Sequence, residues 1–312
     1  MAGLRRRAPG GGGGGFPRPR APLRGAALSE AALPGAGPKR WRDLRKRFLS
    51  ALVLGPAALA CVWLGAEPWT MLIAIAVALL TWEWVHLCGL STRALPGMAV
   101  PVAVLASGVL AVAGHVRAGL AALLVGWGLT WWAAARMRGP DRPGQPAGWL
   151  AAGVLYIGIA GIALIELRHD NQAGRANVLF LLLVVWASDI GAYMAGRTFG
   201  GPKLAPAVSP NKTWSGAVGG LAAAILVGVA VAAALAPGGA SRAAAVAAML
   251  GVMAQAGDLL ESWIKRRFDV KDTSSLIPGH GGLLDRLDGV IAAAPVAALL
   301  AFVLGQGQPL WR

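Results

Sequence analysis

The sequence predicts an all-α protein, a polytopic transmembrane bundle of about nine helices. Its 312 residues are 56% hydrophobic and only 14% charged, and their mean hydropathy is +0.59. Soluble domains average roughly 45–50% apolar and about 25% charged residues. From Phe48 onward, apolar stretches near the ~20 residues that a helix needs to cross a bilayer recur to the end of the chain. The chain is therefore expected to reside in a membrane.

Residues 1–47 are predicted to form a disordered, basic, cytosolic tail. They include a run of glycines at 10–15, several prolines and arginines, and almost no large apolar side chains. Such a segment cannot bury enough surface to fold. A secretory signal peptide would place its apolar stretch close to the start of the chain, whereas the first one here begins near Phe48. The tail is therefore interpreted as preceding the first membrane-spanning helix.

Nine apolar stretches follow the tail. Residues 48–175 are expected to hold the N-terminal transmembrane helices, and residues 176–312 the C-terminal transmembrane catalytic region. Several stretches are rich in Ala and Gly, which favours close approach of helices within a bundle. The expected helices cover residues 48–66, 68–88, 97–115, 118–136, 149–167, 176–195, 215–236, 243–260 and 289–306.

The distribution of Lys and Arg predicts the orientation of these helices. With nine helices and a cytosolic N-terminus, 24 of the 29 basic residues fall on the cytosolic side, as the positive-inside rule requires. The absence of signal and organelle features favours a bacterial inner membrane. Because the basic residues are scattered between apolar spans, anionic membrane lipids are the expected partners and nucleic acid is not.

Three polar stretches fall on the predicted cytosolic side, and the first surrounds Asp189. A carboxylate costs roughly 2.5–3.5 kcal/mol at the centre of a membrane helix, so Asp189 is a candidate functional residue. The alternative is an aspartate paired with a nearby arginine or backbone group. Residues 191–198 imitate a phosphate-binding loop, but no strand precedes them.

The second polar stretch, residues 200–216, leads into an apolar helix. Backbone amides at the start of that helix, together with Lys212 and the hydroxyls of Ser209, Thr213 and Ser215, predict an anion site at the positive end of the helix dipole. The alternative is a simple helix cap after a proline-containing turn.

The third polar stretch, residues 257–289, gives the strongest signal. Asp258, Ser262 and Lys265 are spaced i, i+4 and i+7. If the helix continues through them, they share one face at the membrane boundary. That face would present a carboxylate, a hydroxyl and a cation in line.

Farther along the same stretch, a loop rich in helix breakers contains His280 and leads to Asp285, Arg286 and Asp288. Carboxylates interleaved with cations suit nucleotidyl transfer, because Mg²⁺ prefers a few carboxylate oxygens plus phosphate and water. His280 is expected to contact phosphate or shape the loop. A general base is not needed, since a phosphate monoester loses its second proton at a pKa of about 6.

The third stretch carries a long pattern of constrained positions, which are Ser262, Ile264, Lys265, Arg266, Lys271, Asp272, Ser274, Ile277, Pro278, His280, Gly281, Gly282, Leu283, Asp285, Arg286, Leu287 and Asp288. This pattern resembles the signature of the phosphatidate cytidylyltransferase family. Residues 189–196 and 209–214 also resemble segments of that family, so the resemblance is dense from about 189 to 289 and thin before it.

The resemblance implies an integral membrane enzyme, often dimeric, that condenses CTP with phosphatidate to form CDP-diacylglycerol and pyrophosphate in phospholipid biosynthesis. It implies Mg²⁺ held by Asp258 and Asp285, with a monovalent cation such as K⁺ nearby. It also implicates Ser262 and Lys265 in the reaction.

Two alternative functions remain. One is a CTP-dependent lipid kinase, whose alcohol substrate would need a base, and the other is a transporter with polar groups near the bilayer midplane.

The predicted site combines the residues that the resemblance implies with those of the polar stretches. Asp189 and Asp288 are additional candidate metal ligands beside Asp258 and Asp285. The expected catalytic residues are Asp258, Ser262, Lys265 and Asp285, and the expected phosphate-binding residues are Ser209, Lys212, Thr213, Lys271, His280 and Arg286.

Overall fold

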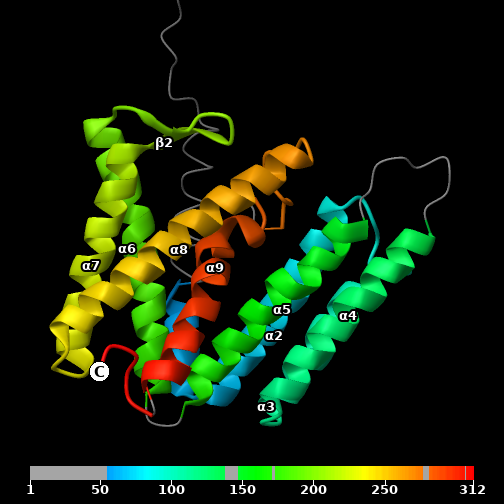
Figure 1. Ribbon diagram of the computed structural model, residues 1–312, viewed down its shortest axis with the longest axis horizontal. Helices are drawn as coiled ribbons and strands as arrows, with labels where there is room; N and C mark the ends of the chain where they lie inside the picture. Colours follow the sequence, from blue (N-terminus) through cyan, green and yellow to red (C-terminus); the bar gives the residue numbers. More distant parts are fainter. Residues whose placement is uncertain (1–54, 138–146, 171–172, 277–280, 306) are drawn as a thin grey trace, which may run out of the picture.

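A computed structural model describes residues 55–137, 147–170, 173–276, 281–305 and 307–312. These residues form a bundle of nine helices, seven of which are long and apolar enough to cross a membrane (Figure 1). The predicted all-α polytopic bundle is therefore confirmed. The predicted tail, residues 1–47, lies outside the described residues, and the division of the chain near residue 175 stays a prediction.

The helices match the apolar stretches in number and order. A short helix, Gly55–Leu64, comes first. The helices at residues 174–199 and 240–267 extend past the apolar stretches that predicted them. The turns at their ends are polar, so hydrophobicity alone did not reveal them. The other bounds are α2 Ala66–Leu87, α3 Ala99–Val112, α4 Val116–Arg136, α5 Ala147–His169, α6 Gly174–Phe199, α7 Trp214–Leu235, α8 Ala240–Arg267 and α9 Leu284–Leu300, with a π-helical turn at Ala301–Gly305.

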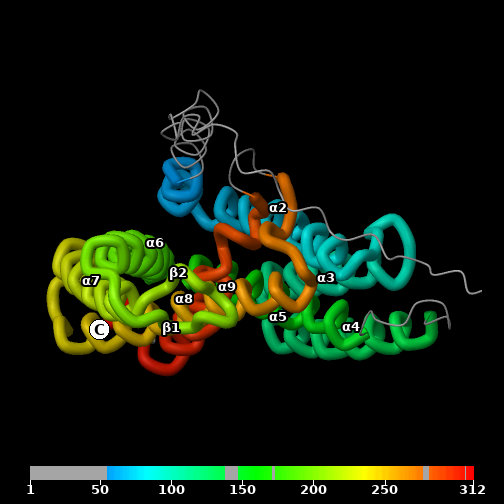
Figure 2. Tube along the Cα trace, turned by 90° about the horizontal axis from the view of Figure 1, so that it is seen from above, coloured from blue at the N-terminus to red at the C-terminus, as the bar shows by residue number. Residues whose placement is uncertain are grey.

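The helices are arranged around α5 and α9. Figures 1 and 2 show α6 and α7 at one end of the molecule, α3 and α4 at the other, and α8 crossing obliquely toward the middle. The most apolar window of α5 is 72% buried, against 22% in α4 and in α7. Helix α5 is therefore the centre of the bundle, and the outer helices leave apolar side chains for lipid.

Small residues bring α6 and α7 together, as the sequence predicted. A Cβ atom added at Gly191 of α6 would lie 2.5 Å from the Cβ of Ala223 and 2.9 Å from the carbonyl oxygen of Gly219, both on α7. A side chain at this position would collide with the neighbouring helix. The absence of one lets the two backbones touch, which stabilises helix pairs in lipid.

A β-hairpin connects α6 to α7. Its antiparallel strands are β1, Lys203–Ala205, and β2, Ser209–Thr213. The sequence predicted only a loop here, because such short segments, with prolines beside and within them, carry almost no strand signal. The predicted helix cap is confirmed, since Thr213 Oγ1 accepts a hydrogen bond from the amide of Gly216 at 3.1 Å.

Candidate active site

Helix α8 is continuous through Asp258, Ser262 and Lys265 and ends at Arg267. The predicted continuation of the helix through all three residues is confirmed. Their spacing therefore places them on successive turns of one face. Asp258, Ser262 and Lys265 are each partly buried.

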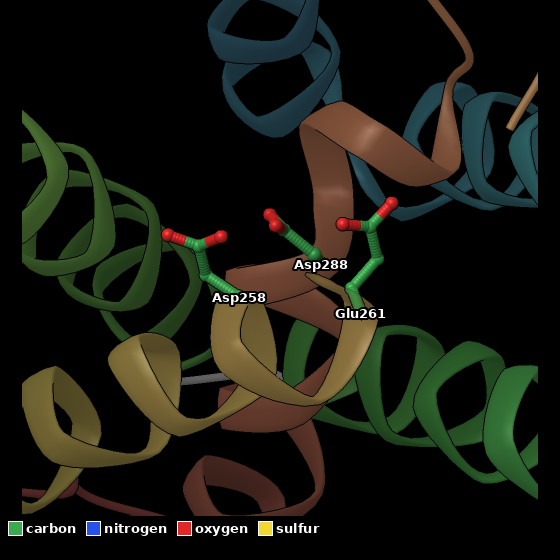
Figure 3. Close-up of side chains that lie close together, drawn as sticks. All are labelled: Asp258, Glu261 and Asp288. Atoms are coloured by element: carbon green, nitrogen blue, oxygen red, sulfur yellow. The ribbon is translucent and has the colours of Figure 1, made fainter. Parts of the chain in front are cut away.

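Carboxylates from α8 and α9 meet beside this face. Asp258 and Glu261 of α8 and Asp288 of α9 each offer an oxygen atom, and these atoms lie within 4.8 Å of one another. Figure 3 shows the three carboxyl groups side by side, with that of Asp288 between those of Asp258 and Glu261. We call these three residues the acidic cluster. It contains two residues that the sequence singled out, together with Glu261, which it did not.

Glu261 is the most confined member of the acidic cluster. Its side chain is 1% exposed, and its Oε1 atom has no hydrogen-bond partner among the described residues. Burying a polar atom without a partner is costly, and burying a charge without compensation costs more. The donor set consists of carboxylate oxygens, which Mg²⁺ prefers. The acidic cluster therefore fits a divalent cation.

Lys265 connects two carboxylates of the site. Its Nζ atom lies 2.6 Å from Oε2 of Glu261 and 2.8 Å from Oδ1 of Asp285. The ammonium thus joins α8 to the first turn of α9. An ammonium has three N–H donors, so one remains beyond these two contacts for a phosphate oxygen.

Asp285 secures the loop that precedes α9. Its Oδ2 atom accepts hydrogen bonds from the amides of Gly282 at 2.8 Å and Thr273 at 3.0 Å, and from the Thr273 hydroxyl at 3.1 Å. Both of its oxygen atoms are therefore engaged with protein groups. Its predicted role as a metal ligand stays a prediction.

The hairpin and the end of α8 lie side by side. Lys212 Nζ of β2 is 2.7 Å from Asp258 Oδ1, and Arg266 Nε donates to the carbonyl oxygen of Val208 at 3.4 Å. The second and third polar stretches therefore gather at one end of the bundle, as expected (Figure 1). Thr213 is engaged in capping α7, and its phosphate-binding role stays a prediction.

The remaining predicted residues surround this region. Asp189, in the second half of α6, interacts electrostatically with Asp258, Lys212 and Arg286. Ser209 is half-buried in β2, and Lys271 is exposed. The predicted phosphate contact of His280 lies outside the described residues.

Charge at the site is unbalanced toward the negative. Five carboxylates gather there, against the three cations Lys212, Lys265 and Arg286. When all are ionised, the excess corresponds to the charge of one divalent cation. A negatively charged nucleotide would bind poorly without such compensation. The five carboxylates are those of Asp189, Asp258, Glu261, Asp285 and Asp288.

Its spacing is the sequence signal that could have identified Glu261. Glu261 stands three residues after Asp258 and four before Lys265. Both spacings put it on the face already identified. The sequence-based prediction assigned Glu261 no role.

The fold and site define a polytopic membrane protein whose acidic and basic side chains meet at one end of a helical bundle, as phosphate-transfer chemistry requires. The model of the Cytidylyltransferase family matches residues 45–304. The chain belongs to this family, and it is therefore a nucleotidyltransferase.

Three bacterial relatives, each named phosphatidate cytidylyltransferase, support this assignment. The protein of Brucella suis biovar 1 is 41% identical over 273 residues, covering 85% of this chain and 95% of the relative. The protein of Pseudomonas aeruginosa is 37% identical and covers 85% of this chain and 100% of the relative. The protein of Haemophilus influenzae is 33% identical, covering 83% and 99%.

Proposed function

We propose that this enzyme transfers CMP from CTP to phosphatidate, forming CDP-diacylglycerol and pyrophosphate in phospholipid biosynthesis. The observation that carries the proposal is the acidic cluster, flanked by Lys212 and Lys265, at one end of a membrane bundle. The relatives named phosphatidate cytidylyltransferase support the same substrates.

In the proposed reaction, an oxygen of the phosphatidate phosphate attacks the α-phosphorus of CTP. A new P–O bond forms there, and the bond from the α-phosphorus to the bridging oxygen breaks. The electron pair leaves with pyrophosphate. No general base is required, because the attacking phosphate is already ionised near neutral pH.

Asp258, Glu261 and Asp288 would hold Mg²⁺, with Asp285 and Asp189 close by. When bound, Mg²⁺ neutralises triphosphate charge and stabilises the charge that develops on transfer. Lys265 keeps the carboxylates of Glu261 and Asp285 together and directs its third N–H to a phosphate. A monovalent cation such as K⁺ belongs to the proposal as a second charge near these groups.

The cations at the rim of the site would hold the remaining phosphate charge. Lys212 and Arg286 stand beside the acidic cluster, and Ser209 and Lys271 belong to the segments around it. His280, which the sequence assigns to phosphate binding, is part of the same proposal. Ser262 would donate a hydrogen bond from α8. The cytosolic side of a bacterial inner membrane suits this site, because CTP is soluble and phosphatidate is confined to the bilayer. That two copies of the chain form a homodimer stays a prediction.

One assay tests the proposed function. Purified protein is incubated with phosphatidate and CTP that is labelled either at the α- or at the γ-phosphate, with Mg²⁺ present or chelated. Label from the α-position is expected in the lipid and label from the γ-position in pyrophosphate, and chelation should abolish both. Transfer of γ-label to lipid would identify a lipid kinase instead.

A further inference from the structure

A buried carboxylate lies outside the site described so far. Glu83 is in the second half of α2, between aromatic residues, and its side chain is 0% exposed. A carboxylate in such a place is expensive unless hydrogen-bond donors surround it. The sequence-based prediction assigned it no role.

The donors to Glu83 come from nearly 200 residues farther along the chain. Its Oε1 atom accepts from Ser274 Oγ at 2.6 Å and from the amide of Leu283 at 2.7 Å. Its Oε2 atom accepts from the amide of Leu284 at 2.7 Å. Figure 2 shows the segment before α9 lying beside α2.

These bonds cap α9 from another helix. The amides at a helix start have no partner within the helix, and negative charge there is stabilised by the helix dipole. Leu283 occupies the cap position of α9, where an apolar side chain cannot accept a hydrogen bond. Glu83 therefore acts as the cap of α9: it accepts hydrogen bonds from the first amides of the helix and places negative charge at the positive end of the helix dipole.

Two carboxylates bind successive amides of the loop before α9. The amide of Gly282 donates to Asp285, whereas the next amide, that of Leu283, donates to Glu83. A Cβ atom at Gly282 would lie 2.9 Å from both carboxylate oxygens of Glu83 and would collide with Thr273 Oγ1. Glycine is therefore needed at this position for the carboxylate to approach the backbone.

We infer that Glu83 is a positioning residue for the transfer reaction, and this inference rests on the proposed function. By fixing the start of α9, Glu83 sets where Asp285 and Asp288 stand relative to Lys265 and the carboxylates of α8. Glu83 itself touches neither metal nor substrate. It makes a helix of the N-terminal half part of the support for the site.

Substitution of glutamine separates this role from simple packing. Glutamine has nearly the same shape as glutamate but replaces one oxygen with an NH₂ donor. Each oxygen of Glu83 faces a backbone amide, so either orientation of the glutamine amide sets a donor against a donor. A packing role predicts that Glu83→Gln behaves like the wild type, whereas an acceptor role predicts a local defect.

The test compares the full-length wild type with Glu83→Gln, and with Glu67→Gln as a control on the exposed first turn of the same helix. Hydrogen exchange of residues 281–288 and the Mg²⁺ concentration for half-maximal transfer are measured. Glu83→Gln should raise the exchange rate of residues 281–288 and the Mg²⁺ concentration for half-maximal transfer by about tenfold each. This is the effect of losing one hydrogen bond to a charged group. Glu67→Gln should change neither.

Two outcomes would overturn the inference. One is wild-type exchange and Mg²⁺ dependence in Glu83→Gln, and the other is an equal rise of exchange in α3 and α4, which would indicate general unfolding. If Glu83→Gln does not fold, Ser274→Ala replaces it, because it removes one donor and leaves both amide bonds. A smaller rise confined to the same peptide is then expected, and wild-type exchange would contradict it.

These measurements keep the two proposals apart. If the wild type shows no transfer from CTP to phosphatidate, the proposed function fails. The exchange of residues 281–288 still decides whether Glu83 holds the start of α9, because it is measured without substrate.

Discussion

Lys212 Nζ in the hairpin lies 2.7 Å from Asp258 Oδ1 on α8. This ion pair joins the connection between α6 and α7 to the acidic cluster. It places a cation next to a carboxylate that would bind metal, so that a triphosphate on the metal would also meet Lys212.

Lys212→Met is expected to lower kcat/KM for CTP by about 10- to 100-fold, the effect of losing one charge-assisted contact. Lys203→Met, in the other strand of the hairpin and exposed, is the matched control and should change kcat/KM little. Steady-state assays with CTP varied at saturating phosphatidate measure the difference. Equal effects in both variants would show that only net charge matters.

Asp258 and Asp285 are expected to differ when each is changed to Asn. Asp258→Asn should reduce transfer by at least about 1,000-fold, because it removes charge from the acidic cluster, and it should leave thermal stability nearly unchanged. Asp285→Asn should lose activity and also stability, because three donors of the loop and Lys265 depend on its carboxylate.

Activity and thermal unfolding in detergent measure these two effects together. Asp269→Asn is the control, because Asp269 is exposed and has a φ of 53°, a conformation that asparagine tolerates. Near-normal transfer in both Asp258→Asn and Asp285→Asn would refute the metal assignment.

Glu261→Gln tests whether the unpartnered oxygen of Glu261 contacts the metal. We expect a rise of about tenfold in the Mg²⁺ concentration for half-maximal transfer, since one charged ligand of a small set is lost. Membrane insertion should be normal. A lower kcat with unchanged Mg²⁺ dependence would instead assign Glu261 to holding Lys265.

Much of this site was predictable, because most of its residues lie within the single polar stretch 257–289. The helical spacing of Asp258, Ser262 and Lys265 needed only the period of an α-helix, and the apolar spans needed only the thickness of a bilayer. The positive-inside count predicted that the 200–216 and 257–289 stretches lie on the same side of the membrane, and their polar residues were expected to meet there. Contacts between Arg266 and Val208 confirm that they do.

Other features depend on contacts that sequence spacing does not encode. Glu83 meets Ser274 across 191 positions, and an isolated glutamate in an apolar helix gives no indication of its partner. Likewise, the family resemblance implied Asp285 as a metal ligand, and Asp288 was only an additional candidate. Tertiary packing separates them, turning Asp285 toward the loop and Asp288 toward the acidic cluster.

The buried thiol of Cys88 provides a prediction about chemical labelling. Burial raises the pKa of its thiol from 9.0 to about 12, so at pH 8 the thiol stays protonated and unreactive. In a Cys61→Ala background, maleimide should label native protein far more slowly than protein unfolded in detergent. Fast labelling of the native state would contradict the burial of Cys88.

The same shift has a consequence for stability. Between pH 9 and 12 the unfolded chain releases the Cys88 proton while the folded chain retains it, so stability falls as pH rises through this window. Below pH 9 the Cys88 thiol is protonated in both the folded and the unfolded chain, so its contribution to stability is fully present. Comparing unfolding of the wild type and Cys88→Ala across this range should show a steeper decline in the wild type.

The contact between α6 and α7 leads to a prediction about packing. Gly191→Ala would place a Cβ atom 2.5 Å from that of Ala223, so the two helices must separate. Overpacking of this kind costs about 1–3 kcal/mol. Because α6 and α7 flank the hairpin, activity should fall along with thermal stability.

Gly128→Ala is the control, since a Cβ atom at this position on α4 meets nothing within 4 Å. It should keep stability unchanged or raise it by up to about 1 kcal/mol through better helix propensity. Equal stability of the two variants would show that the close approach of α6 and α7 is not needed.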